Sequence, residues 1–138
     1  MYLIDTNLIS EIRKKKKANN GVLKFFSEVV KKNECLYISA ITIGELRRGI
    51  DLLLYRGDIK QAKQLDKWLG SILDEYQDNI IDIDEQVAQL WGKLRVPHHE
   101  HAIDKQISAT AIINNLILVT RNVKDFEKTG VKVLNPFC

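Results

Sequence analysis

The residues of this sequence best suited to chemistry are four acids: Asp5, Glu45, Asp104 and Asp125. Asp5 and Asp125 come just after apolar segments with the composition of β-strands, and Glu45 follows another such segment by about one helical turn. The carboxyl ends of parallel strands share one edge of a sheet, so side chains placed beyond them can converge. Asp104 opens a helix that leads to a strand, and it joins the other acids only if that helix start lies over the same edge.

Carboxylates that converge repel each other, and a bound divalent cation relieves this repulsion. A donor set made of oxygen atoms alone, without Cys or His, favours Mg²⁺ or Mn²⁺. The sequence therefore predicts a Mg²⁺ or Mn²⁺ site whose ligands are Asp5, Glu45, Asp104 and Asp125.

Each of these acids also has a purely local alternative, in which it stabilises the start of a helix. Asp5, or its neighbours Thr6 and Asn7, can cap the helix that follows. Residues 42–45 fit the S/T-x-x-E capping box, and Asp104 is a natural N-cap. Capping accounts well for any one acid, but it accounts less well for several acids near one edge of a sheet.

Two hydrophobic patterns alternate along the chain. Segments with the composition of strands occupy residues 2–4, 35–39, 80–83, 116–120 and 131–134. An unbroken apolar run such as that at residues 2–4 is typical of a strand buried on both faces, and residues 131–134 are expected at the edge of the sheet. Apolar residues at helical spacing predict helices over residues 8–17, 22–30, 43–53, 58–78, 84–94 and 104–112. This alternation predicts an α/β domain with a mainly parallel sheet, and right-handed crossovers place helices on both of its faces. At this length we expect one domain, residues 1–138.

Two other clusters invite a functional interpretation. His98, His99 and His101 share a short segment, which is a pattern found in transition-metal sites. Because no Cys accompanies them and Pro97 marks a loop, an exposed loop over the site is the better interpretation. The basic run at residues 13–17 is either a solvated helix end or a contact for a polyanion.

The composition excludes several classes of protein. Hydrophobic residues make up 45% of the chain and charged residues 28%, which is typical of a soluble globular protein and not of a disordered one. We find no apolar run long enough to span a membrane, and no secretory signal at the start. Cys35 and Cys138 are too few for a disulfide framework, which favours reduced thiols in the cytoplasm.

The charge distribution favours an anionic substrate. The chain has 21 Lys and Arg against 18 Asp and Glu, so setting aside the four candidate acids leaves 14 acids and a surplus of seven positive charges. An acidic, metal-binding cleft in a basic body suits a phosphodiester. The basic residues close to the acids in sequence are Arg47, Arg48, Lys105, Arg121 and Lys124.

Four motifs in this order, with a closing segment, resemble the PIN-domain ribonucleases, and specifically the VapC-type toxins of bacterial toxin–antitoxin pairs. The motifs are Leu3-Ile4-Asp5-Thr6-Asn7, Ser39-Ala40-Ile41-Thr42-Ile43-Gly44-Glu45-Leu46, Asp104-Lys105-Gln106-Ile107-Ser108-Ala109-Thr110-Ala111 and Thr120-Arg121-Asn122-Val123-Lys124-Asp125-Phe126, and the closing segment is Val133-Leu134-Asn135-Pro136-Phe137. The resemblance implies a three-layer fold with a five-stranded parallel sheet, Mg²⁺- or Mn²⁺-dependent endoribonuclease activity, a homodimer and a cognate antitoxin.

The resemblance also implies roles for individual residues. Asp5, Glu45 and Asp104 match the three metal-binding acids of the family. Some members have an acid at the position of Asn122, and we take Asp125 as the fourth acid here. The residues expected to support the acids or to contact RNA are Thr6, Asn7, Thr120, Asn122, Arg47 and Arg121.

The mechanism expected from these residues is metal-assisted hydrolysis of RNA. One rival is phosphoryl transfer through an aspartyl phosphate on Asp5, but such phosphatases have a second Asp two residues later, where this chain has Asn7. A rival of another class is a non-catalytic module on the same fold that binds RNA or a partner.

Overall fold

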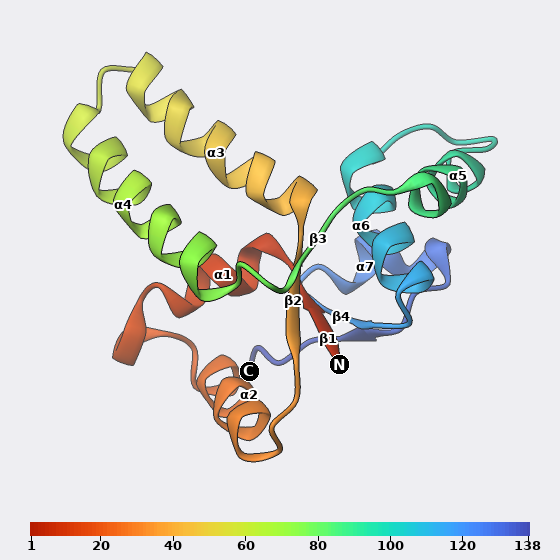
Figure 1. Ribbon diagram of the computed structural model, residues 1–138, viewed down its shortest axis with the longest axis horizontal. Coiled ribbons are helices and arrows are strands. Elements are labelled where there is room, and N and C mark those ends of the chain that lie inside the picture. Colours follow the sequence, from red (N-terminus) through yellow and green to blue (C-terminus); the bar gives the residue numbers. More distant parts are fainter.

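The computed structural model describes all residues, 1–138, and is built on a five-stranded parallel sheet with the order β3-β2-β1-β4-β5 (Figure 1). The strands are short: β1 (Tyr2–Ile4), β2 (Leu36–Ser39), β3 (Ile80–Ile81), β4 (Ile117–Val119) and β5 (Val133–Leu134). Every pairing is parallel. The predicted fold class and all five strands are therefore confirmed; β1 has the predicted bounds, and the other four strands are shorter than predicted.

The strand order contains a switch point next to β1. The chain builds outward from β1 to β2 and β3 on one side, and then returns to place β4 and β5 on the other side. Tyr2 lies opposite Leu36 of β2 and opposite Ile117 of β4, so the ends of the three central strands are in register. Ligands of open α/β sheets bind beyond the carboxyl ends of the strands at such a switch point, and Asp5 directly follows β1 there.

Seven helices connect the strands. They are α1 (Thr6–Ile12), α2 (Asn20–Lys31), α3 (Ala40–Tyr55), α4 (Ile59–Glu75), α5 (Glu85–Leu94), α6 (Ala102–Ile113) and α7 (Val123–Phe126). One predicted bound was wrong, and one helix was missed. The first helix ends at Ile12, and the basic run beyond it forms a separate 3₁₀ turn at Lys15–Lys17. The short helix α7 was not predicted.

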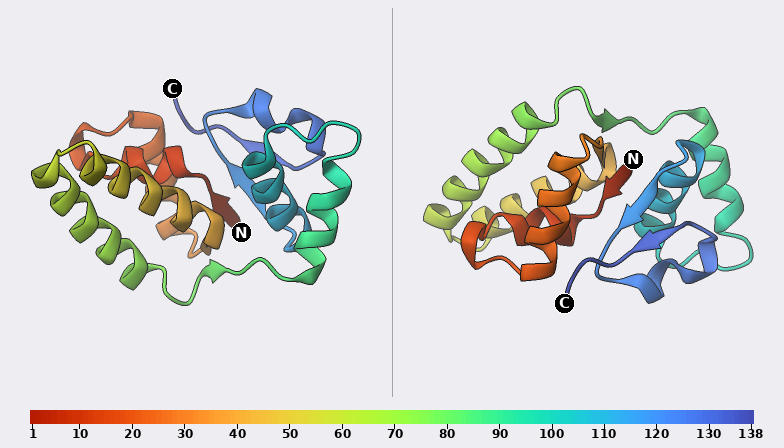
Figure 2. Two further views of the ribbon diagram at one scale, coloured as in Figure 1. Left: turned by 90° about the horizontal axis from the view of Figure 1, so that it is seen from above. Right: turned by 90° about the horizontal axis from the view of Figure 1, so that it is seen from below.

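The sheet is the middle of three layers, as the two views of Figure 2 show. Alternating side chains of the strands enter different cores, because successive residues of a strand point to opposite faces. Ile4 packs with helices α1 to α4 in one cluster of 13 buried residues, whereas Leu3 packs with α6 and α7 in a second cluster of six. Helix α5 packs on α6 at the outside. None of the helices combines the length and apolar character that crossing a lipid bilayer requires.

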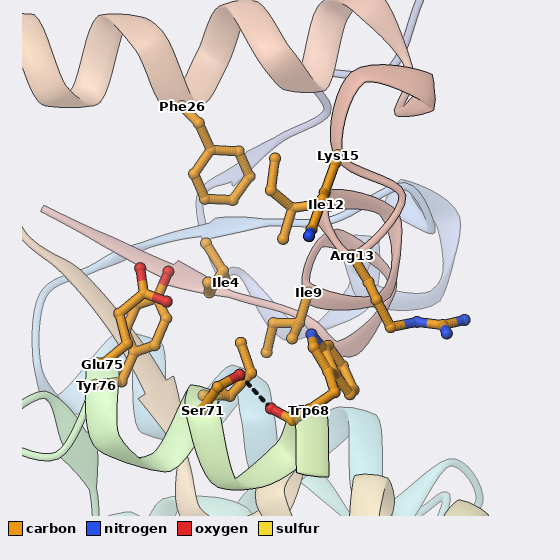
Figure 3. A pocket seen from close by; sticks show the side chains of 11 residues that line it. Ile4, Ile9, Ile12, Arg13, Lys15, Phe26, Trp68, Ser71, Glu75 and Tyr76 are labelled. Carbon is orange, nitrogen blue, oxygen red and sulfur yellow. Dashed lines mark hydrogen bonds between the residues drawn. The ribbon is translucent and has the colours of Figure 1, made fainter. Parts of the chain in front are cut away.

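A small, mostly apolar cavity of about 220 Å³ lies between α1, α2 and α4 (Figure 3). Ile4, Ile9 and Phe26 line it, and the guanidinium of Arg13 lies 5.6 Å from the ring centre of Trp68 at its side. None of the predicted site residues lines this cavity. It is a gap in the packing of the first core, and the candidate site is elsewhere.

The C-terminal segment packs against the start of α2. Asn19, the N-cap of α2, donates from its side-chain amide to the carbonyl of Cys138 at 3.0 Å and accepts from the Cys138 N–H at 3.2 Å. The chain passes so close to Gly21 that a Cβ at this position would lie 2.0 Å from the carbonyl oxygen of Pro136. Only Gly fits here without displacing backbone.

Gly21→Ala is therefore expected to lower the free energy of unfolding by about 1–3 kcal/mol, the usual range for overpacking. Urea denaturation followed by circular dichroism measures this change. Gly70→Ala is the matched control, because no atom lies within 4 Å of a Cβ at this position in the middle of α4. It should instead stabilise the protein by about 0.5–1 kcal/mol through helix propensity. Equal effects of the two substitutions would contradict the close approach at Gly21.

Candidate active site

Asp5 lies at the end of β1, beside the end of β4, and only 7% of it is exposed. Its backbone N–H donates to the carbonyl of Val119, which extends the β1–β4 pairing by one residue. Its Oδ1 accepts from the N–H of Thr6 at 2.8 Å, so Asp5 does cap α1, as the local alternative predicts. Its Oδ2 accepts from the hydroxyl of Thr120 at 2.8 Å. Capping therefore uses only part of the accepting capacity of Oδ1. Asp5 keeps lone pairs that can bind another group.

The environment of Asp5 disfavours its charged form. Burial raises the pKa of this carboxyl above its ordinary value, and the hydrogen bonds from Thr120 and Thr6 offset only part of this effect. Repulsion from Asp125 raises the pKa further. A buried carboxyl with a raised pKa next to another acid is a candidate functional group.

Asp104 lies in the first turn of α6 and is half-buried. Burial raises its pKa, repulsion from Asp5 and then Asp125 raises it further, and only His101 acts in the opposite direction. The start of α6 therefore lies near the edge of the sheet that carries Asp5, which is the condition that the sequence left open. The prediction that Asp104 opens this helix was wrong, and so was the alternative that Asp104 caps it: α6 begins at Ala102 and its N-cap is His101, in the left-handed conformation with φ 55°.

Glu45 is also not a capping residue. Helix α3 begins directly after β2, and its N-cap is Ser39, whose hydroxyl accepts from the N–H of Ile41 at 3.2 Å. Thr42 is buried inside the helix, so residues 42–45 do not form a capping box. Glu45 is partly buried and lines a cavity of about 360 Å³ together with Thr6, the neighbour of Asp5.

Asp125 follows β4 on the short helix α7, and it acts electrostatically on both Asp5 and Asp104. Asn122, the other candidate for this position, precedes the helix and is exposed. The backbone N–H of Asn122 donates to the Thr120 hydroxyl at 3.1 Å. Asp125 is exposed as well, but it carries a charge that repels Asp5 and Asp104, which the neutral Asn122 does not, so Asp125 stays the candidate for the fourth acid.

Three polar side chains join the ends of β1 and β4. Asn7 donates from its amide to the hydroxyl oxygen of Thr120 at 3.2 Å, and more weakly to Oδ2 of Asp5 at 3.5 Å. Its own side-chain oxygen accepts from the N–H of Arg121 at 3.2 Å. The predicted support for Asp5 from Asn7 and Thr120 is thus present as hydrogen bonds.

Thr120→Val is expected to reduce catalytic activity by about 10–100-fold, because support of this kind orients a carboxylate. The hydroxyl of Thr120 lowers the pKa of Asp5, so its removal raises that pKa further, and activity should begin to rise only at a higher pH than in the unmodified protein. Thr120→Ser keeps the hydroxyl and should restore the original pH profile. An unchanged profile in Thr120→Val would contradict the assigned role.

The two predicted arginines differ in their surroundings. Arg47 is engaged elsewhere: it donates to Asp66 of α4 at 2.8 Å and to Asp51 at 3.5 Å, so it joins α3 to α4. Arg121 follows β4 directly, and its guanidinium lies 5.1 Å from the ring centre of Phe137. No function was predicted for Phe137 from the sequence. Its place in the closing segment was the only feature that drew attention to this residue.

The carboxylates of Glu45, Asp104 and Asp125 accept no hydrogen bond and form no salt bridge. No three acidic, histidine or cysteine side chains lie close enough together to enclose a metal ion as they stand. The chemistry of the donor set nevertheless fits a hard divalent cation, because the donors are free oxygen atoms and because Asp5, Asp104 and Asp125 repel one another.

A family model described as "PIN domain" matches residues 2–132. The chain belongs to the PIN domain family. Its sheet order agrees with that assignment, and Asp5 lies close enough to Asp104 for repulsion to raise the pKa of Asp104.

Individual relatives match over nearly the full length. The toxin FitB of Neisseria gonorrhoeae is 34% identical, with 99% of each chain covered. The VapC ribonuclease Y4jK of Sinorhizobium fredii is 28% identical, with 99% of this PIN-domain chain and 98% of the relative covered. The crystal structure of FitAcB from Neisseria gonorrhoeae superposes with a TM-score of 0.81 at 34% identity, covering 99% of this chain and 98% of that one.

Proposed function

We propose that residues 1–138 form one PIN-type nuclease domain that hydrolyses RNA phosphodiester bonds as an endoribonuclease. The observation that carries this proposal is the electrostatic coupling of Asp5, Asp104 and Asp125 at the switch point of the sheet. The similarity to a protein named VapC ribonuclease supports RNA as the substrate. The surplus of basic residues outside the acids supports a polyanion in general.

In this proposal Asp5, Glu45, Asp104 and Asp125 hold Mg²⁺ or Mn²⁺. A bound divalent cation supplies an activated water and neutralises charge that develops on the phosphate oxygens. Asp5 is the fixed ligand, since Thr6 and Thr120 hold its two oxygens in place. The carboxylates of the other three acids accept no hydrogen bond, so none has to be broken when they bind a cation.

The chain's own side chains have further roles. Glu45, which lines a cavity together with Thr6, orients the attacking water or binds metal. Arg121, beyond the end of β4, is placed to hold a phosphate of the strand. Arg47 is not proposed as an RNA contact, because its guanidinium is paired with Asp66.

We further propose that the protein is the toxin of a toxin–antitoxin pair and acts in the cytoplasm, where cellular RNA is accessible. The 34% identity to a protein named toxin FitB over 99% of both chains supports this role. The cognate antitoxin is a protein partner that covers the acids. A homodimer is proposed as the assembly, and Leu54, Tyr55 and Ile59, exposed around the turn from α3 to α4, offer apolar surface for it.

Incubation of purified protein with total RNA and Mg²⁺ or Mn²⁺ tests the proposal, with fragment sequencing as the readout. Cleavage at defined internal positions is the expected result. Binding of RNA without cleavage under any divalent cation would favour the rival, a non-catalytic binding module on the same fold.

A further inference from the structure

A polar cavity of about 350 Å³ lies beside the candidate active site, between the loop of residues 97–101, the start of α6 and the α7 segment. No hydrophobic side chain lines it. We call it the lysine pocket, after its three cations Lys105, Lys124 and Lys128. A cavity of this volume is large enough for one nucleotide unit.

The three cations of the lysine pocket have no acidic partner within salt-bridge distance. Lys105 donates from Nζ to the backbone carbonyl of His98, and so ties the loop to α6. Lys124 on α7 and Lys128 on the 3₁₀ turn Glu127–Thr129 are four residues apart, and both are exposed and line the pocket. Two acids, Glu100 and Asp125, also line the pocket, but the three ammonium groups outnumber them, so the lining as a whole attracts an anion.

The lysine pocket and the candidate active site share a wall. Asp125 lines the pocket, and it also acts electrostatically on Asp5 and Asp104. Lys105 directly follows Asp104 along α6. An anion in the pocket therefore lies beside Asp125, one of the candidate acids.

We propose that the lysine pocket binds a phosphate group of the RNA strand adjacent to the bond that is cleaved. This inference rests on the proposed function and adds to it a binding site for the phosphate next to the cleaved bond. A phosphate suits the pocket better than a base, because single-stranded bases bind by stacking on aromatic or apolar walls. The only rings in the lining are the imidazoles of His98 and His101.

The test measures RNA binding in the Asp5→Asn background, so that the RNA is not cleaved. The probe is a short fluorescein-labelled single-stranded RNA, and its fluorescence anisotropy is measured at a series of KCl concentrations. Adding Lys124→Gln with Lys128→Gln should weaken binding about tenfold at low salt. It should also reduce the slope of log affinity against log salt by about 0.7 for each phosphate that the protein no longer neutralises.

The matched control is Lys63→Gln with Lys67→Gln. These two exposed lysines are also four residues apart on a helix and unpaired, but they lie on α4, on the far side of the molecule from α7 (Figure 1). The control should leave affinity and slope unchanged, and neither pair should change Tm.

If the Lys124/Lys128 and Lys63/Lys67 double variants bind RNA with equal affinities and equal salt slopes, the lysine pocket does not bind a phosphate of the RNA. This conclusion would hold even if the unmodified protein cleaves RNA. The converse failure is separate: a protein that never cleaves RNA refutes the proposed function, whereas the binding comparison does not depend on cleavage. With Asp5 intact, the Lys124 and Lys128 variant should raise KM for RNA and leave kcat within about twofold, as expected when an interaction that serves only binding is removed.

Discussion

Asp5→Asn is expected to abolish RNA cleavage and yet to raise the stability of the metal-free protein. The substitution removes a metal ligand from the buried end of β1, and a loss of several kcal/mol of transition-state stabilisation lowers the rate about 10³-fold or more. The shape is kept, because Asn can still accept from the N–H of Thr6 and donate to the hydroxyl of Thr120. Glu45→Gln and Asp104→Asn should also lose activity, since their carboxylates are likewise free to bind metal.

The stability effect follows from the raised pKa of Asp5. Because the folded state holds the proton more tightly than the unfolded state, the carboxyl carries no penalty below its ordinary pKa. The penalty appears as the pH rises through the raised folded-state value, and at neutral pH the charged, buried group destabilises the fold. In metal-free buffer, Tm of Asp5→Asn should therefore exceed that of the unmodified protein at pH 7, and the difference should vanish in acid.

Asp74→Asn is the control for this pair of measurements. Asp74 is an exposed residue of α4 whose side chain makes no hydrogen bond or salt bridge. It should change neither cleavage nor the pH dependence of Tm. Full activity in Asp5→Asn would show that Asp5 is not part of the active site. A Tm of Asp5→Asn below that of the unmodified protein at pH 7 would show that the charge of Asp5 does not destabilise the metal-free protein.

Expression of this chain alone is expected to stop the growth of a bacterial host, and co-expression of its neighbouring antitoxin should restore growth. The physical reason is the acidic cleft with basic flanks, which suits an inserted peptide that carries Arg or Lys. Such a cation would pair with Asp5, Glu45 or Asp104 and relieve the same repulsion that a metal relieves. The apolar part of the partner would cover helix faces, as in helix-in-groove recognition.

Growth curves of strains that express the unmodified chain, Asp5→Asn, or either together with the antitoxin measure this effect. The antitoxin should co-purify with both forms of the chain, because inhibition requires direct binding. If the unmodified chain and Asp5→Asn are equally harmless without any antitoxin, the toxin role fails, although a nuclease activity in vitro could still stand.

Much of this architecture could be predicted because the signals are local. The unbroken apolar runs at β1 and β4 fill both cores, with Leu118 in one and Val119 in the other, and such runs are typical of strands buried on both faces. Helix α7 escaped prediction because it has four residues and one buried anchor, Phe126, which is too short for any periodicity.

The errors at the site came from contacts that a local pattern does not contain. Asp is normally a better N-cap than His, but the left-handed turn at His101 starts α6 earlier, so Asp104 lies inside the helix with a free carboxylate. The sequence near Arg47 resembles a basic flank of the site. Its partner Asp66 lies 19 residues away on α4, and only the packing of α3 against α4 brings the two together.

The parallel topology predicted that acids following the strands would lie near one another. Whether an acid at the start of a helix joins them depends on where that helix begins. Asp5 and Thr120 meet because β1 and β4 are neighbours at the switch point. Asp104 lies near enough to Asp5 for the two carboxylates to repel each other, because of where α6 begins. No residue pattern near Asp104 specifies that placement.

The central claim is that carboxylates at the end of β1 and on the adjoining helices create a metal-dependent ribonuclease. Cleavage of RNA by the purified chain, with Mg²⁺ or Mn²⁺ present or removed by a chelator, tests it most directly when Asp5→Asn is assayed in parallel. The account predicts internal cleavage that requires the divalent cation, stops on chelation, resumes when metal is restored, and is absent from Asp5→Asn. Cleavage that persists in excess chelator, or equally in Asp5→Asn, would contradict it.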